Sequence, residues 1–260
     1  MRRVIVAPYI LLLLALATTA EAQGCQGYAG QVIKTRSFGE LRAALPKVPA
    51  KSEFETTEQF TQRLAAFGSA DPVIVAKPGV ANTIYNADRG GFTFPAGALF
   101  NERMDQIGTV GNPDAQTILK AASYDSDVMH IVLFSKFFLV SSGISQTGSY
   151  VGGNALGVRA TVKKFAETVS ALVTDQDVSY DLDAFVPMEL AAAKAAKQTL
   201  RIAYVVRPHA PFFTSIKGES PATLDDLRDV TTVVNAISAE VRCALVYTVP
   251  DQRVVGVVTF

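Results

Sequence analysis

The sequence has no excess of charge of either sign. Its 260 residues include 24 lysines and arginines and 24 aspartates and glutamates. A protein that binds along nucleic-acid phosphates carries a basic excess, so this balance argues against nucleic acid as a partner. It also gives no electrostatic reason to expect binding to an anionic membrane surface.

Histidine is scarce, with only two residues in the chain. A metal site needs His, Cys or carboxylate ligands at helical or hairpin spacing. His130 and His209 lie in different predicted elements, so the sequence does not supply that spacing. We therefore predict no zinc site and no cofactor.

Common catalytic motifs are also missing. No Gly-x-Ser-x-Gly nucleophile elbow occurs, and the glycine-rich stretch 148–157 lacks the Gly-Lys-Ser/Thr ending of a phosphate-binding loop. We interpret its glycines as a turn or bulge between two strands. Ser145 and Ser149 lie in the same region, and His209 is expected in a loop between Pro208 and Pro211. His209 is therefore the remaining candidate for a catalytic residue.

The sequence does contain an amino-terminal leader. Arg2-Arg3 precedes an apolar stretch at 4–17, and Ala20-Glu21-Ala22 then gives the small-x-small pattern that signal peptidase accepts. This order is typical of a secretory signal. The apolar stretch is shorter than the about 20 residues that span a bilayer, and no second long run follows. We predict a signal peptide at 1–22, a mature chain without a transmembrane helix, and a location in the periplasm or outside the cell.

The predicted mature chain contains two cysteines, Cys25 and Cys243. In an oxidising compartment such a pair tends to become a disulfide, which here would join the mature N-terminus to a late core strand. Two alternatives stay open. Cys243 is a small buried apolar residue and Cys25 is free, or Cys25 carries a lipid anchor. The run Ala22-Gln23-Gly24 before Cys25 matches a lipid-attachment site only in part.

The clearest helix is predicted at 53–67. Thr56 and Gln59 are spaced as a capping box, Phe54 is placed to act as a hydrophobic staple, and Gly68 is suited to end the helix. A second helix is predicted at 183–200, where alanine and lysine alternate in short runs.

Alternating and apolar runs predict more strands than helices. No repeat or linker divides the chain. We predict the α+β class: a lead-in at 23–52, then a single domain at 53–260 on a mainly antiparallel β-sheet with two or three helices. The predicted strands are 73–76, 83–85, 92–94, 129–140, 158–163, 200–206, 237–247 and 254–260.

Four aspartates form an acidic cluster between the predicted strands and the second helix. Carboxylate oxygens of this kind suit Ca²⁺, but the spacing departs from that of an EF-hand loop. A solvated loop and a helix N-terminus explain the carboxylates more simply. The cluster consists of Asp175, Asp177, Asp181 and Asp183.

Two segments resemble a group of uncharacterised exported bacterial proteins. Residues 53–63 contain the Glu-Phe-Glu-Thr-Thr opening followed by Phe60 and Arg63, and residues 150–157 contain Tyr-Val-Gly-x-Asn-Ala-x-Gly. Leu156 stands where that pattern more usually has an aromatic residue. The resemblance covers two short stretches and implies export from a bacterium. It implies no activity.

These observations lead to two hypotheses about function. The first is a non-enzymatic exported module that binds a small ligand or an envelope component through loops at one end of its sheet. The second is a hydrolase whose active-site residues are scattered in sequence around His209 and the acidic cluster. The absence of a catalytic motif favours the first, while the ligand, the oligomeric state and any catalysis stay open.

We expect the mature protein to begin at Gln23, because signal peptidase cuts after Ala22. N-terminal sequencing and intact mass of the protein from a bacterial periplasmic extract measure this directly. A chain found in the cytosol with Met1 still attached would contradict the prediction.

Overall fold

The computed structural model describes residues 24–49, 51–99, 137–153, 157, 159–174, 184–249 and 251–260. The predicted signal peptide, His130 and the four aspartates of the acidic cluster lie outside these residues. So does most of the strand predicted at 129–140, of which only the last four residues are described.

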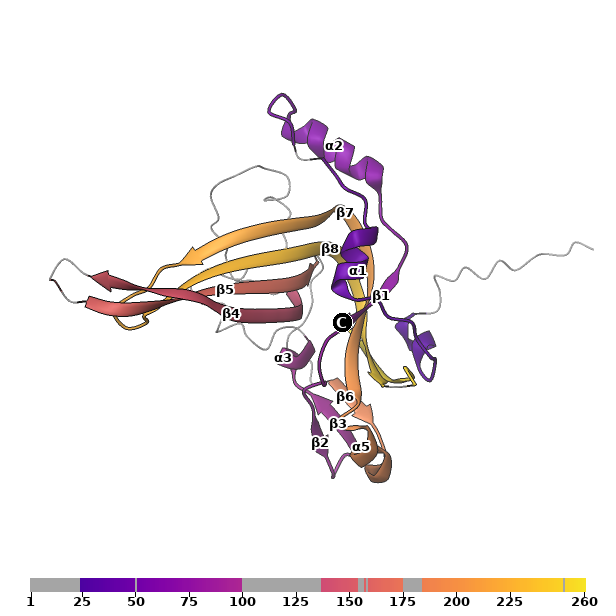
Figure 1. The fold of residues 1–260 in the computed structure, drawn as a ribbon. Helices are drawn as coiled ribbons and strands as arrows, with labels where there is room; N and C mark the ends of the chain where they lie inside the picture. The colour runs from indigo at the N-terminus through magenta and orange to yellow at the C-terminus, as the bar shows by residue number, and fades with distance from the viewer. Residues whose placement is uncertain are drawn as a thin grey trace, which may run out of the picture.

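Six strands form one curled sheet in the order β1-β7-β8-β5-β4, with β9 added to β8 (Figure 1). Its central pair, β7 and β8, contains 21 residues in each strand and is antiparallel over almost the whole length. β1 pairs with β7, while β5 and β9 pair with β8, and β4 pairs with β5. The bounds are β1 (Val73–Lys77), β4 (Phe137–Gly153), β5 (Arg159–Val173), β7 (Leu200–Ser220), β8 (Arg228–Thr248) and β9 (Val254–Thr259).

The α+β class is confirmed, but the main sheet is mixed. β5 runs parallel to β8, while the other pairs of this sheet are antiparallel. Parallel neighbours need a long crossover connection. Here the chain leaves β5 and forms β6 (Ala184–Pro187), α5 (Leu190–Ala196) and β7 before it returns as β8.

A second, three-stranded sheet has the order β2-β3-β6. Its hairpin of β2 (Ile84–Asn86) and β3 (Gly91–Phe94) confirms the strands predicted there. The helix predicted from residue 183 is wrong in its first part, because β6 pairs with β3 and buries alternate residues Ala184 and Val186. A Cβ atom on Gly256 of β9 would lie 2.4 Å from a methyl group of Val186. Glycine at that position therefore lets the two sheets touch.

The predicted capping box of the first long helix is confirmed. α2 (Thr57–Phe67) has the Thr56 side chain accepting from the Gln59 amide, and Gly68 ends it with a φ of 63°. The staple is wrong, since Phe54 is 89% exposed. A turn closed by the Glu55 amide and the Ser52 carbonyl directs this segment away from the helix stripe. The other described helices are η2 (Cys25–Tyr28), α1 (Phe38–Ala44) and α3 (Ala96–Leu99).

Both faces of the inner part of the β7–β8 pair are buried. Ala244 and Val246 point into a large cluster with Tyr204 and residues of the small sheet. Cys243, Leu245 and Tyr247 point into a smaller cluster on the opposite face. The single alternation predicted for residues 237–247 is interrupted between Val241 and Cys243, where the register with β7 shifts. Up to Val241 the odd-numbered residues lie in the large cluster, and from Cys243 onward they lie in the smaller one. The strand is therefore central and buried on both faces, not half-buried.

The lead-in is bonded to the domain along its length. Cys25 and Cys243 form a disulfide, with Cα atoms 6.3 Å apart across 218 residues of sequence. The amide of Ile33 donates to the carbonyl of Gln252, and Phe38 and Leu41 of α1 are buried in the large cluster. The predicted pairing of the two cysteines is therefore present.

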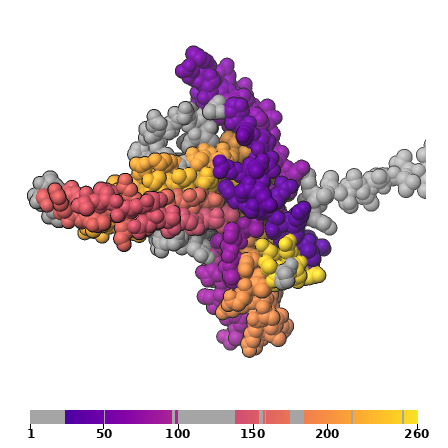
Figure 2. Space-filling view, viewed as in Figure 1, coloured from indigo at the N-terminus to yellow at the C-terminus, as the bar shows by residue number. Residues whose placement is uncertain are grey.

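The outer parts of four strands project from the body of the molecule as an arm, which is plain in Figures 1 and 2. The glycine-rich stretch 148–157, predicted as a turn or bulge between two strands, continues β4 as far as Gly153, and β5 begins at Arg159. The register of β4 with β5 shifts just before this stretch, between Gln146 and Gly148. Likewise β7 does not end at Pro208, although its register with β8 is interrupted between Pro208 and Phe213. The arm consists of residues 141–153, 159–170, 213–220 and 228–238.

Loss of the disulfide is expected to destabilise the protein. In the chain-entropy model a crosslink that closes so long a loop contributes about 5 kcal/mol, and removal of a native disulfide from a small secreted domain costs about 2 to 5 kcal/mol. We expect Cys25→Ser to lower the free energy of unfolding by an amount in this range, as measured by urea denaturation. Cys243→Ser should lower the free energy of unfolding by more, because that side chain is fully buried and the new hydroxyl would lie among apolar groups. If both thiols of the native protein react with an alkylating agent before reduction, the prediction is wrong.

Candidate functional site

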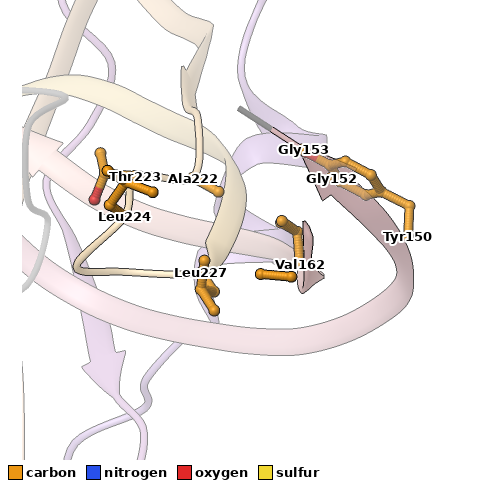
Figure 3. Close-up of a pocket in the computed structure, with 9 residues that line it drawn as sticks. Tyr150, Gly152, Gly153, Val162, Ala222, Thr223, Leu224 and Leu227 are labelled. Atoms are coloured by element: carbon orange, nitrogen blue, oxygen red, sulfur yellow. The ribbon is translucent and has the colours of Figure 1, made fainter. Parts of the chain in front are cut away.

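A groove of about 320 Å³ lies at the end of the arm (Figure 3). One wall comes from β4 and β5, and the other from the loop at 221–227 between β7 and β8, which we call the tip loop. We call this cavity the tip groove. Its lining residues are Tyr150, Gly152, Gly153, Ala160, Val162, Ala222, Thr223, Leu224 and Leu227.

Strand register builds the first wall. Tyr150 pairs with Val162, and Gly152 pairs with Ala160, so these four residues share one face of the sheet. A Cβ atom on Gly152 would lie 3.2 Å from a methyl group of Val162. The absence of a side chain at Gly152 therefore leaves the space beside the Tyr150 ring open.

The tip loop is held in place by backbone and side-chain hydrogen bonds. The Ala222 amide donates to Asp229 Oδ1 at 2.6 Å, and the Asp226 amide donates to Thr223 Oγ1 at 3.1 Å. The Lys163 amide donates to the Leu227 carbonyl at 2.9 Å, which ties the loop to β5. The second wall of the groove is thus formed before any ligand arrives.

Tyr150 connects the two walls. Its hydroxyl donates a hydrogen bond to Asp229, which raises the pKa of the tyrosine. The Nζ atom of Lys164 lies 5.1 Å from the centre of the ring, within the range of a cation–π contact. The Ala222 amide, the Tyr150 hydroxyl and the Lys164 charge, in that order, lower the pKa of Asp229. Asp229 is therefore ionised at neutral pH and anchors both walls.

Several apolar side chains that line this groove are exposed to solvent. Leu224 is 76% exposed, and Tyr150 and Leu227 are each exposed by about two fifths. Isolated exposed apolar residues are ordinary, but a contiguous group beside a cavity marks a binding surface. The tip of the arm has this character.

The structure places His209 away from the tip groove, within β7 where the register is interrupted. It lies in a backbone bridge with Ser69, and its Nδ1 atom is 3.0 Å from the carbonyl oxygen of Ala210. Among the described residues, this carbonyl is the one hydrogen-bond partner of the ring. His209 is thus not brought together with Ser145 or Ser149, which are exposed on β4 of the arm.

Within the described ranges, no three His, Cys, Asp or Glu side chains form a group that could hold a metal ion. The candidate calcium ligands at 175–183 lie outside those ranges. None of the helices that the structure describes has the length and hydropathy needed to cross a membrane.

The sequence shows one part of the tip groove but not the meeting of its two walls. The stretch 148–157 is conspicuous for its glycines, whereas the tip loop contains no motif. Two exposed leucines, Leu224 and Leu227, were the available indication of a surface within that loop. The parallel register of β5 and β8 brings the two segments together, and no local pattern encodes it.

Comparison with protein-family models, with curated proteins and with solved structures gave no match in any of the three. The resemblance to exported bacterial proteins is therefore still a prediction.

Removal of the Tyr150 hydroxyl should raise the pKa of Asp229 toward its ordinary value, because a donated hydrogen bond favours the carboxylate. We expect this shift in Tyr150→Phe, measured by NMR titration of the carboxyl carbon. Since folding lowers this pKa, the anchoring by Asp229 is present at neutral pH and is lost as the pH falls through the folded value. Tyr28→Phe, at the opposite end of the molecule, is the control and should leave the titration unchanged. An unchanged pKa in Tyr150→Phe would show that the hydroxyl does not reach Asp229.

Proposed function

We propose that this protein is an exported, non-enzymatic binding module of the bacterial envelope, and that its tip groove holds an apolar group of a small ligand or envelope component. The observation that carries the proposal is the exposed apolar surface of Tyr150, Leu224 and Leu227 around a formed cavity.

The size and composition of the tip groove support this proposal. Small-molecule sites span about 300 to 1,000 Å³ and are lined mainly by apolar side chains with a few placed polar groups. The tip groove has a volume of about 320 Å³ and is lined by glycine, alanine, valine, leucine and one tyrosine. The hydroxyl of Thr223 is the polar side-chain group of the tip-loop wall. An aliphatic or aromatic group matches such a lining best.

Preorganisation also supports binding. The tip loop is fixed by its hydrogen bonds to Asp229 and Lys163, and Tyr150 is held by its contacts with Asp229 and Lys164. A ligand that enters the groove therefore does not have to order the loop, which reduces the entropic cost of association.

Location outside the cytoplasm is supported by the leader and by the disulfide between Cys25 and Cys243. The hydrolase hypothesis gains no support at His209, whose described surroundings provide neither a nucleophile nor an orienting carboxylate in hydrogen-bond contact with the ring.

Binding at the tip groove can be measured with 1-anilinonaphthalene-8-sulfonate, an apolar probe whose fluorescence rises on burial. We expect the double variant Leu224→Ser, Leu227→Ser to bind the probe about tenfold more weakly, because partial burial of two leucines contributes about 1 to 2 kcal/mol. Phe54→Ser is the matched control, since Phe54 is an isolated apolar residue that is 89% exposed. Its titration should equal that of the native protein.

Two results would contradict the proposal. The first is an unchanged probe titration in the leucine double variant. The second is turnover of an esterase, phosphatase or peptidase substrate that is lost in His209→Ala. Co-sedimentation with neutral phosphatidylethanolamine vesicles distinguishes the two sources of the apolar group. If the protein sediments with the vesicles and the leucine double variant does not, the group belongs to an envelope lipid. If the native protein does not sediment with them, the group belongs to a free ligand.

A further inference from the structure

β4 is an edge strand of the part of the sheet that the structure describes. It lies at the end of the main sheet and pairs with β5 alone among the described strands. From Ser142 to Thr147 and from Ser149 to Val151 its residues are exposed. An edge strand of this kind presents a row of unpaired N–H and C=O groups that can bond to another strand.

The lead-in covers two other edges of the same sheet. On β1, the Arg36 amide donates to the Ile74 carbonyl at 2.8 Å, and the Ala76 amide donates to the Arg36 carbonyl at 2.9 Å. On β9, the Gly30 amide donates to the Val254 carbonyl at 3.0 Å, and the Val254 amide donates to the Gln31 carbonyl at 2.8 Å. The backbone groups of these edges are therefore satisfied within the chain.

The opposite edge of the arm, formed by the last part of β7, carries protecting residues. Lys217 and Glu219 form an exposed ion pair at 2.7 Å. Charges and proline are the usual means by which proteins prevent pairing at an edge. The 17 residues of β4 contain neither a charged residue nor a proline. The two edges of the arm thus differ in charge, and β4 is the uncharged one. Its register with β5 shifts between Gln146 and Gly148, so the regular stretches available for pairing are 141–146 and 148–153.

We propose that β4 pairs edge to edge and antiparallel with β4 of a second copy of this chain, which makes the protein a two-fold symmetric dimer through its arms. This inference goes beyond the proposed function and uses a different surface. The arm part of β4, residues 141–153, extends about 40 Å at the usual rise per strand residue. The arm projects from the body in Figures 1 and 2, and β4 lies along one of its edges in Figure 1.

A second copy fits this edge better than a strand from another protein. Recognition of a foreign strand depends on pockets that select its side chains. The side chains of the exposed part of β4 are mainly serine, glycine, threonine and glutamine, and the tip groove is confined to the last residues of the strand. An uncharged strand meets no like-charge repulsion from its own copy, and antiparallel pairing about a two-fold axis makes one surface complementary to itself.

Sedimentation equilibrium of the exported, disulfide-intact protein tests this dimer. We expect a native dimer and, in the double variant Ser145→Lys, Thr147→Lys, dimerisation that is about tenfold weaker or more, because both copies then place two positive charges on the shared edge. The matched control is Thr161→Lys, Thr168→Lys, which adds the same charge at exposed positions of β5, an interior strand. That control should dimerise as the native protein does. Far-UV circular dichroism verifies that each variant is folded.

Charge complementation gives a second measurement on the same edge. An equimolar mixture of the Lys double variant with Ser145→Glu, Thr147→Glu should dimerise at least as well as the native protein. If the native protein stays monomeric up to about 100 μM, the proposal is overturned, because most specific complexes have formed at that concentration. The partner of the β4 edge would then be a strand of another protein. A dimer that is unaffected by the edge substitutions also overturns it, because its interface must then lie elsewhere.

Discussion

The antiparallel ladder between β7 and β8 is the interaction on which the rest of the structure depends. At its inner end both faces are buried, by a large cluster around Tyr204 and Val246 and by a smaller one around Leu245. At its outer end the same two strands leave the core and carry the arm. The ladder is interrupted between Pro208 and Phe213 and resumes beyond this segment, so the body and the arm are parts of one sheet.

The edges of that sheet explain the arrangement of the N-terminal lead-in. It lies along β9 and β1 and forms backbone hydrogen bonds with both, and Cys25 ties its beginning to Cys243 in the inner part of the ladder. The lead-in also contributes Ile33, Phe38 and Leu41 to the buried clusters. The lead-in, which the sequence presents as a segment before the domain, is thus part of the folded domain. Exposed sheet edges and an unfilled core would both be unfavourable without it.

The two surfaces of the arm are chemically distinct. The tip collects exposed apolar side chains around a cavity whose walls are already fixed by Asp229 and Lys163. The long side of β4 has uncharged, mainly small polar side chains and an open backbone edge. A cavity suits a compact apolar group, whereas an open edge suits an extended strand. The arm can therefore present two binding surfaces that do not overlap over most of their length.

The sequence by itself determined what depends on neighbouring residues. The capping box of Thr56 and Gln59, the end of α2 at Gly68, and the pairing of β8 with β9 are local, and all are present. The predicted export leader is also a local pattern, and it lies outside the described residues. Only the tertiary structure decided the parallel pairing of β5 with β8, the burial of Ala184 and Val186 in β6, and the meeting of Tyr150 with Asp229. These features join segments far apart in the chain, and they are fixed by packing and register because no short pattern specifies which strands become neighbours.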